Sequence, residues 1–154
     1  MVARPWLQHY DPGLPSTLRP YPQRTLLDVM GDTVAQRPEH TALIFKGARI
    51  SYASLEQLTN AFGAALVAQG VRKGERVALL LPNSPQSIIA QLGAWKAGAI
   101  VSPINSLYTP HELIHALNEI SAETVVVLTP FYDKVKALQG ETSVRRVIAT
   151  NIKE

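Results

Sequence analysis

Short apolar runs alternate along this chain with longer stretches in which apolar residues recur at helical spacing. The run VALLL at residues 77–81 and the run VVVL within residues 123–128 have strand length and carry no polar position. Such runs are typical of parallel strands that are buried on both faces. Shorter runs at residues 100–102, closed by Pro103, and at residues 146–149 predict two further strands.

The hydroxyl residues before the helical stretches are start signals. Thr25, Ser84 and Thr109 can each act as an N-cap, and Asp28 and Glu112 complete capping boxes. Another helix is expected to begin at Ser51 or at Ser54, which makes a capping-box pattern with Gln57, and to end at Gly70. The other expected helices cover residues 25–36, 84–98, 109–120 and 130–138. Their expected buried residues are Leu27, Met30, Val34, Leu55, Leu58, Phe62, Ala65, Leu66, Ile88, Ile89, Leu92, Trp95, Leu113, Leu117 and Ile120.

The order of these elements predicts the fold class. Residues 41–45 and 49–51 flank a Lys-Gly-Ala turn and predict a small hairpin, and after it strands and helices alternate to the end. Residues 76–105 read as strand, turn, helix and strand, which predicts a right-handed βαβ unit. We therefore expect an α/β fold, a mostly parallel sheet with helices on both faces.

Residues 1–24 differ from the rest because they contain five prolines: Pro5, Pro12, Pro15, Pro20 and Pro22. Proline at this density opposes helix and sheet pairing, so we expect an irregular leader that runs as an extended strap. The leader has three aromatic residues, Trp6, Tyr10 and Tyr21. We expect them to anchor the leader by packing on another surface, and a membrane interface is the alternative. We therefore divide the chain into two units, the leader at residues 1–24 and a folded unit at residues 25–154.

Composition excludes several classes of protein. The chain has 154 residues, enough for one domain with a core, and its net charge of +3 comes from scattered residues. Such a scattered distribution of charge predicts no basic patch of the kind that binds nucleic acid. No cysteine is present, which rules out disulfides and cysteine metal ligands. The absence of cysteine leaves the compartment open but agrees with the cytoplasmic location that we expect. The apolar runs are too short to span a bilayer, and the N-terminus lacks a signal-peptide core.

One stretch matches a metal-site motif. His111, Glu112 and His115 fit H-E-x-x-H, which on a helix places two histidines on one face for zinc, with the glutamate as base. Glu112, however, is also the capping-box residue, and no third ligand is evident. Two surface histidines on a capped helix are the favoured interpretation.

Other candidate chemistry is sparse. Asp28 and Asp32 lie one turn apart on the outer side of a helix, without a pocket for acid–base work. The turn Pro82-Asn83-Ser84-Pro85 is no phosphate loop, because its two prolines lack N–H donors. Gly93 and Gly98 have the spacing of a Walker loop without its lysine, and more plausibly permit close helix packing and a helix stop. With no G-x-S-x-G elbow either, the residues themselves predict a scaffold without an active site.

Four segments carry a family resemblance. They are PWLQHYDPGLP at residues 5–15, GVRKGERVALLLPNSP at residues 70–85, NSLYTPHELIHALN at residues 105–118 and VRRVIAT at residues 144–150. With them the chain resembles, nearly end to end, the N-terminal part of AMP-forming acyl-CoA synthetases of the adenylate-forming superfamily. The first and third segments look most like the long- and medium-chain fatty-acid branch.

The resemblance implies a ligase as the full-length parent. Such an enzyme activates a fatty acid with ATP and Mg²⁺ to acyl-AMP and pyrophosphate, and the thiol of coenzyme A then forms the thioester. The family's phosphate loop ending in Pro-Lys-Gly, its aromatic-Gly-x-Thr-Glu segment, its ribose-binding Asp and its C-terminal lysine are not found in these residues. We therefore expect residues 25–154 to be an N-terminal α/β subdomain cut before the phosphate loop.

For the chain alone we expect no catalytic, cofactor-binding or metal-binding residue, no bound cofactor and no activity. The loop at residues 105–108 follows a parallel strand and is the best ligand-facing candidate, against a structural loop. The resemblance leaves a homodimer and peripheral membrane association open. The alternative function is a stand-alone scaffold or interaction module from a truncated ligase paralogue, whose sheet edges would favour association.

Overall fold

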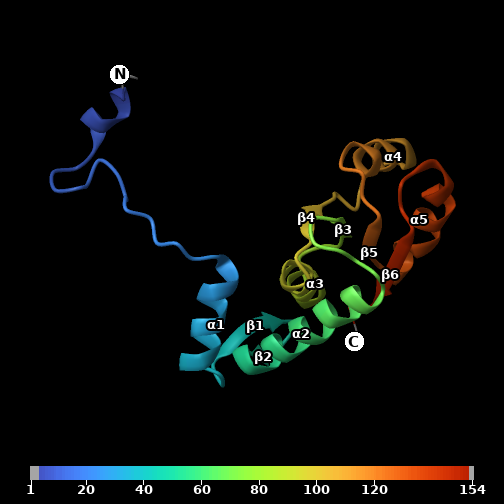
Figure 1. The fold of residues 1–154 in the computed structure, drawn as a ribbon, viewed down its shortest axis with the longest axis horizontal. Helices are drawn as coiled ribbons and strands as arrows, with labels where there is room; N and C mark the ends of the chain where they lie inside the picture. The colour runs from blue at the N-terminus through green and yellow to red at the C-terminus, as the bar shows by residue number, and fades with distance from the viewer. Residues whose placement is uncertain (1–3, 153–154) are drawn as a thin grey trace.

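The computed structural model of the protein describes residues 4–152, and its centre is a parallel sheet (Figure 1). The sheet has four strands in the order β4-β3-β5-β6, and all neighbours are parallel. Separately, β1 (Thr41–Phe45) and β2 (Ala48–Ser51) form an antiparallel hairpin. The sheet strands are β3 (Arg76–Leu80), β4 (Ile100–Pro103), β5 (Thr124–Leu128) and β6 (Arg146–Thr150). The predicted α/β class with a mostly parallel sheet is confirmed.

The helices begin close to the expected residues. Thr25, Ser84 and Thr109 are N-caps with reciprocal capping boxes, whereas Ser51, and not Ser54, caps the helix after the hairpin. Three short 3₁₀ helices accompany them, η1 (Pro5–His9), η2 (Thr129–Phe131) and η3 (Gln139–Glu141). The α-helices are α1 (Leu26–Gln36), α2 (Tyr52–Ala68), α3 (Pro85–Lys96), α4 (Pro110–Glu119) and α5 (Tyr132–Leu138).

Both faces of the sheet are covered by helices, as predicted. Alternate strand residues point to opposite faces. On one face Leu80, Val125 and Val127 pack with Leu113 and Leu117 of α4 in one core cluster. On the other face Val77, Leu79 and Val126 pack with Leu66 of α2 and with Ala90 and Ala94 of α3 in a second cluster.

The predicted inner faces of α2 and α3 need correction. Leu58 and Ala65 are exposed and Phe62 is half-buried, whereas Thr59 and Gly63 are buried with Leu55 and Leu66. On α3 the buried residues are Ala90, Gly93 and Ala94; Ile88 is exposed, and Ile89, Leu92 and Trp95 are half-buried.

A close crossing of the two helices explains this difference. A Cβ atom on Gly63 would lie 2.8 Å from the carbonyl oxygen of Gly93, and a Cβ on Gly93 would lie 2.9 Å from the carbonyl oxygen of Thr59. Small residues therefore face the partner helix, and larger apolar residues are displaced to the sides. The prediction that Gly93 permits close helix packing is confirmed, and Gly98, at φ +78°, ends α3 as predicted.

The first helix is less buried than predicted. Leu27, Met30 and Val34 are half-buried, and no residue of α1 is fully buried. Leu26 and Val29 are exposed. The helix therefore rests on the body through part of one side.

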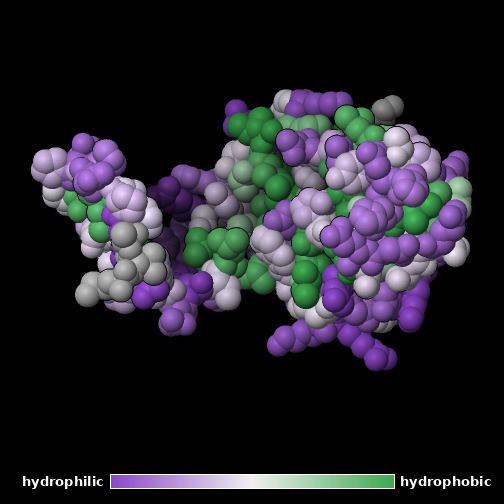
Figure 2. All heavy atoms as spheres, turned by 90° about the horizontal axis from the view of Figure 1, so that it is seen from above, coloured by the Kyte–Doolittle hydropathy of each residue, from purple (hydrophilic) through white to green (hydrophobic). Residues whose placement is uncertain are grey.

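The leader runs away from the body as an extended arm (Figures 1 and 2). Trp6, Tyr10 and Tyr21 are 53%, 46% and 58% exposed, so the prediction that these side chains anchor the leader by packing is wrong for the described part of the chain. Residues 1–3 of the leader, and residues 153–154 of the predicted second unit, lie outside the described residues. Within the described residues, no helix combines the length and the hydrophobicity that crossing a membrane requires.

Candidate functional site

The carboxyl ends of β3 and β5 are where an α/β sheet of this topology would hold a ligand. The chain passes from β3 to β4 on one side and then returns to β5 on the other side of β3. Ligands of open α/β sheets bind in the crevice at such a switch of direction. Residues 81–85 directly follow β3, and residues 129–131 directly follow β5.

The hydroxyl groups after β3 form hydrogen bonds within the chain. Ser84, which is 6% exposed, accepts a hydrogen bond through Oγ from the N–H of Ser87 at 3.4 Å. The hydroxyl of Ser87 in turn donates to the carbonyl oxygen of Ser84 at 2.7 Å. Since Pro82 and Pro85 have no N–H, this helix start offers no phosphate cradle like that of a glycine-rich loop.

The loop at residues 105–108 is a turn held by internal bonds. The side-chain oxygen of Asn105 accepts from the N–H of Leu107 at 3.0 Å, and its carbonyl oxygen accepts from the N–H of Tyr108 at 3.2 Å. Lys134 of α5 donates to the carbonyl oxygen of Tyr108. Leu107 at the tip is 84% exposed. These contacts favour the structural interpretation of the loop.

The H-E-x-x-H residues lie on α4, where each has a local role or faces solvent. The carboxylate of Glu112 accepts from the N–H and the hydroxyl of Thr109, each at 2.8 Å. These bonds, first the one from the backbone, lower the pKa of Glu112. His115 lies 3.9 Å from Glu119, and both side chains are exposed. Over residues 4–152, no three His, Cys, Asp or Glu residues are placed to hold a metal ion.

The paired aspartates of α1 have similar local roles. Asp28 accepts from the N–H and the hydroxyl of Thr25, and these bonds, the backbone one first, lower the pKa of Asp28. Asp32 pairs with Arg24. Both carboxylates lie on the exposed side, as predicted.

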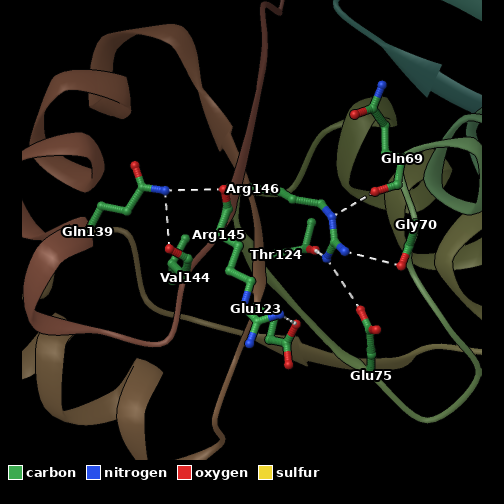
Figure 3. A network of polar contacts seen from close by, with 9 residues as sticks. All are labelled: Gln69, Gly70, Glu75, Glu123, Thr124, Gln139, Val144, Arg145 and Arg146. Atoms are coloured by element: carbon green, nitrogen blue, oxygen red, sulfur yellow. Dashed lines mark hydrogen bonds and ion pairs between the residues drawn. The ribbon is translucent and has the colours of Figure 1, made fainter.

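Two basic side chains near the sheet, Arg146 and Lys96, also form hydrogen bonds with other residues of this chain. Arg146 of β6 donates to the carbonyl oxygens of Gln69 at 2.8 Å and Gly70 at 3.1 Å, and to Glu75 at 3.3 Å (Figure 3). A fourth bond, 3.2 Å long, goes to the hydroxyl of Thr124. Arg146 thus joins the end of α2 to the amino end of the sheet. Lys96 on α3 similarly bonds Glu56, Thr59 and Asn60 of α2.

One feature absent from the sequence predictions is an apolar groove of about 590 Å³ beside the hairpin. Its walls come from the hairpin, α2, α3 and the last strands of the sheet. We call it the hairpin groove. Its apolar lining includes Phe45, Ile50, Leu58, Phe62, Ile89, Val126, Ile148 and Ile152. The alternation of Leu43 and Phe45 against exposed Ile44 is the sequence signal that could have indicated it.

Comparison with protein families gives a match to the model described as AMP-binding enzyme, over residues 31–153. The chain belongs to this family. A long-chain-fatty-acid–CoA ligase of Bacillus subtilis (strain 168) is 34% identical over 153 residues, which are 98% of this chain and 27% of that protein. The ligase of the same name from Escherichia coli O157:H7 is 34% identical over 152 residues, again 98% of this chain and 27% of that protein.

Solved structures of the family have the same fold. A long-chain-fatty-acid-CoA ligase from Archaeoglobus fulgidus matches with a TM-score of 0.82 and 30% identity, over 92% of this chain and 30% of that one. A Mycobacterium tuberculosis fatty acyl CoA synthetase matches with a TM-score of 0.73 and 27% identity, over 80% and 26%. The chain thus spans about a quarter of the length of the curated AMP-binding enzymes that it matches.

Proposed function

We propose that this chain is the N-terminal part of an AMP-forming fatty-acid–CoA ligase. The observation that carries the proposal is 34% identity to a long-chain-fatty-acid–CoA ligase along 98% of the chain. In the proposed reaction the intact enzyme joins a fatty acid to AMP with release of pyrophosphate, and then transfers the acyl group to coenzyme A. Under this proposal we expect a cytoplasmic enzyme.

We infer that residues 4–152, which the structure describes, hold no site for ATP, Mg²⁺ or coenzyme A. After β3 the hydroxyls of Ser84 and Ser87 are bonded to each other's backbone. Elsewhere in the chain, Arg146 pairs with Glu75 and Lys96 with Glu56. No step of the reaction is therefore assigned to a residue of this chain. We propose that its part in the ligase is to form one sheet layer of the larger domain, and that it is inactive alone.

The test compares this chain with the whole product of its reading frame. Palmitate-dependent formation of pyrophosphate and AMP is measured with ATP, Mg²⁺ and coenzyme A for both. We expect the longer product to form palmitoyl-CoA, and residues 1–154 to form none. Activity in residues 1–154 alone, or a longer product that leaves palmitate unchanged, would contradict the proposal.

A stand-alone interaction module is the second candidate, and the open hairpin groove is the observation that favours it. It predicts a stop codon directly after the codon for Glu154 and a folded product that associates with a ligase subunit. Reading the gene past that codon separates the two candidates.

A further inference from the structure

The leader arm, which we define as residues 4–24, exposes large apolar and aromatic side chains in a part of the molecule that stands apart from the sheet (Figures 1 and 2). Leu14, Leu18 and Tyr21 are 59%, 76% and 58% exposed. Trp6 and Tyr10, nearer its start, are 53% and 46% exposed. Large apolar side chains gathered on a surface in this way are typical of a site that binds a protein or a membrane.

Two basic side chains of the leader arm line the same open concavity, of about 690 Å³. Arg4 and Arg19 are far apart in the sequence, yet both border it, together with the hydroxyl-bearing residues Tyr10, Ser16, Thr17 and Tyr21. The N–H of Arg19 donates to the hydroxyl oxygen of Thr17 at 3.2 Å, which holds part of this bend. Guanidinium and hydroxyl groups around one space are the donors that phosphate oxygens accept.

The charge of the leader arm favours an anionic partner. Between residues 4 and 24 the sequence has one acid, Asp11, against Arg4, Arg19 and Arg24. Arg24 pairs with Asp32 of α1, whereas Arg4 and Arg19 form no ion pair with any residue in the range 4–152. The two arginines that border the concavity therefore keep their charge for a partner.

The backbone of the leader arm separates a membrane from a protein sheet as that partner. Prolines lack the N–H that a strand needs, so the arm is poorly suited to pair with a strand of another protein; they stand at residues 5, 12, 15, 20 and 22. A lipid surface needs no backbone partner. The indole of Trp6 and the phenol of Tyr21 join an apolar ring to a polar tip, which suits the boundary between head groups and acyl chains.

We propose that the leader arm docks on the surface of a membrane that contains anionic phospholipid. Arg4 and Arg19 bind phosphate groups of the lipids, while Trp6, Leu14 and Leu18 enter the layer beneath the head groups. Because the arm stands away from the sheet, it reaches a flat surface without the helices that cover the sheet. The inference goes beyond the proposed function and does not depend on it.

Vesicle flotation with the full product of the reading frame tests the proposal. The probes are vesicles of phosphatidylcholine alone, and of phosphatidylcholine with about one third phosphatidylglycerol. We expect the protein to float with the anionic vesicles and to stay in the dense fraction with the neutral ones. Equal flotation with both kinds of vesicle, or flotation with neither, would contradict the proposal.

Tryptophan emission reports whether the leader arm itself enters the lipid. Residues 1–154 contain two tryptophans, so Trp95→Phe leaves Trp6 as the emitting residue. We expect the emission of Trp6 to move to shorter wavelength when anionic vesicles are added, because its ring leaves water. Unchanged emission from a variant that floats with these vesicles would mean that another part of the chain binds them.

A matched pair of double variants separates the leader arm from the total charge. Arg4→Gln with Arg19→Gln removes two charges from the arm, and Arg72→Gln with Lys73→Gln removes two exposed charges from the loop before β3. We expect the first double variant to weaken binding to anionic vesicles about 30-fold, and the second less than about 2-fold. Equal losses would overturn the proposal.

A second matched pair tests the apolar part of the contact without changing the charge. Leu18→Ser lies in the leader arm at a residue that is 76% exposed, and Leu107→Ser lies outside it at a residue that is 84% exposed. Both side chains face solvent, so neither change should prevent folding. We expect Leu18→Ser to weaken vesicle binding about 5-fold and Leu107→Ser to leave it unchanged. Equal binding by the two variants would overturn the insertion of the arm.

Other partners give distinct results. If the leader arm packs on a second copy of the chain, the protein runs as a dimer on a sizing column without vesicles, and Leu18→Ser makes it monomeric. If Arg4 and Arg19 hold a free anion, inorganic phosphate alone shifts the emission of Trp6. Either result overturns the proposal.

The inference and the proposed function can fail separately. A product of the reading frame that forms palmitoyl-CoA but does not float with anionic vesicles overturns the membrane docking alone. A product that floats with them but leaves palmitate unchanged overturns the function alone.

Discussion

The two faces of the sheet differ in how completely the helices of this chain cover them. On the face of α4 and α5, Leu113, Leu117 and Val135 are at most 1% exposed and fill the space between helices and strands. On the face of α2 and α3, the helices meet through Gly63 and Gly93, and the space beside them stays open as the hairpin groove.

The difference arises from the helices, since both faces use the same strands. Strand residues on both faces are buried, Val125 and Val127 on one side and Val77 and Val126 on the other. Large residues on α4 close their face within this chain, whereas small residues on α2 and α3 bring two helices close together and leave the hairpin to one side. A buried strand therefore does not by itself indicate that both of its layers are complete.

Truncating a buried side chain on the face covered by α4 and α5 should have the largest effect on the free energy of unfolding. Leu117→Ala removes a side chain that is 1% exposed and leaves a cavity between α4 and the sheet. We expect a loss of about 3 kcal/mol in the free energy of unfolding, measured with urea. Leu107→Ala, at a residue that is 84% exposed, is the control and should change it by less than about 0.5 kcal/mol. Equal effects would mean that the α4 face is not a packed core.

Adding one methyl group at the helix crossing tests the other face. In Gly63→Ala the new Cβ would lie 2.8 Å from the backbone oxygen of Gly93, so α2 and α3 must separate. We expect a loss of about 2 kcal/mol. Gly31→Ala on α1 has open space and should gain about 0.5–1 kcal/mol from helix propensity. Urea unfolding of both variants should give changes of opposite sign; two gains would rule out the close crossing.

Removing the link between α2 and the amino end of the sheet should have a smaller effect. Arg146→Met keeps much of the side-chain volume but removes the donors to Gln69, Gly70 and Glu75. We expect a loss of about 1–2 kcal/mol, because carbonyl oxygens and a carboxylate lose their partners. Arg145→Met, at a side chain that is 73% exposed, is the matched control. If urea midpoints of the two variants agree, Arg146 does not hold α2 in place.

The smallest effect is expected from pH. The lowered pKa of Glu112 means that its carboxylate stabilises α4 above the ordinary pKa of 4.5, and that this stability is lost as pH falls through the lowered value. Glu112→Gln should therefore reduce stability at pH 7 and weaken its decline in acid. Urea midpoints measured from neutral to acid pH test this, with Glu39→Gln in the exposed loop after α1 as control. An unchanged acid profile would contradict the capping role.

The sequence predicted most of the elements and their starts. Continuous apolar runs indicated β3 and β5, and hydroxyl caps with Pro85 and Pro110 indicated the starts of α3 and α4, because these signals act within a few residues. The buried face of α2 could not be obtained in this way. Whether Leu58 or Thr59 faces inward depends on how closely α3 approaches, which is a tertiary contact.

The candidate site was predictable only through local chemistry. The prolines around Ser84 indicated that the turn after β3 lacks a phosphate cradle, and Glu112 was predicted as a capping residue as well as a zinc-motif residue. The hairpin groove combines residues of β1, α2 and β6 that are up to about a hundred positions apart in the sequence. Short-range periodicity carries no information about such a surface.

Amide hydrogen exchange would test the contrast between the two faces most directly. It is measured for residues 1–154 and for the whole product of the reading frame. We expect β5 and α4 to exchange slowly in both, and β1, β2 and the edge of β6 to exchange fast in residues 1–154 and slowly in the longer product. Equal protection of the hairpin and the β6 edge in both products would contradict the account.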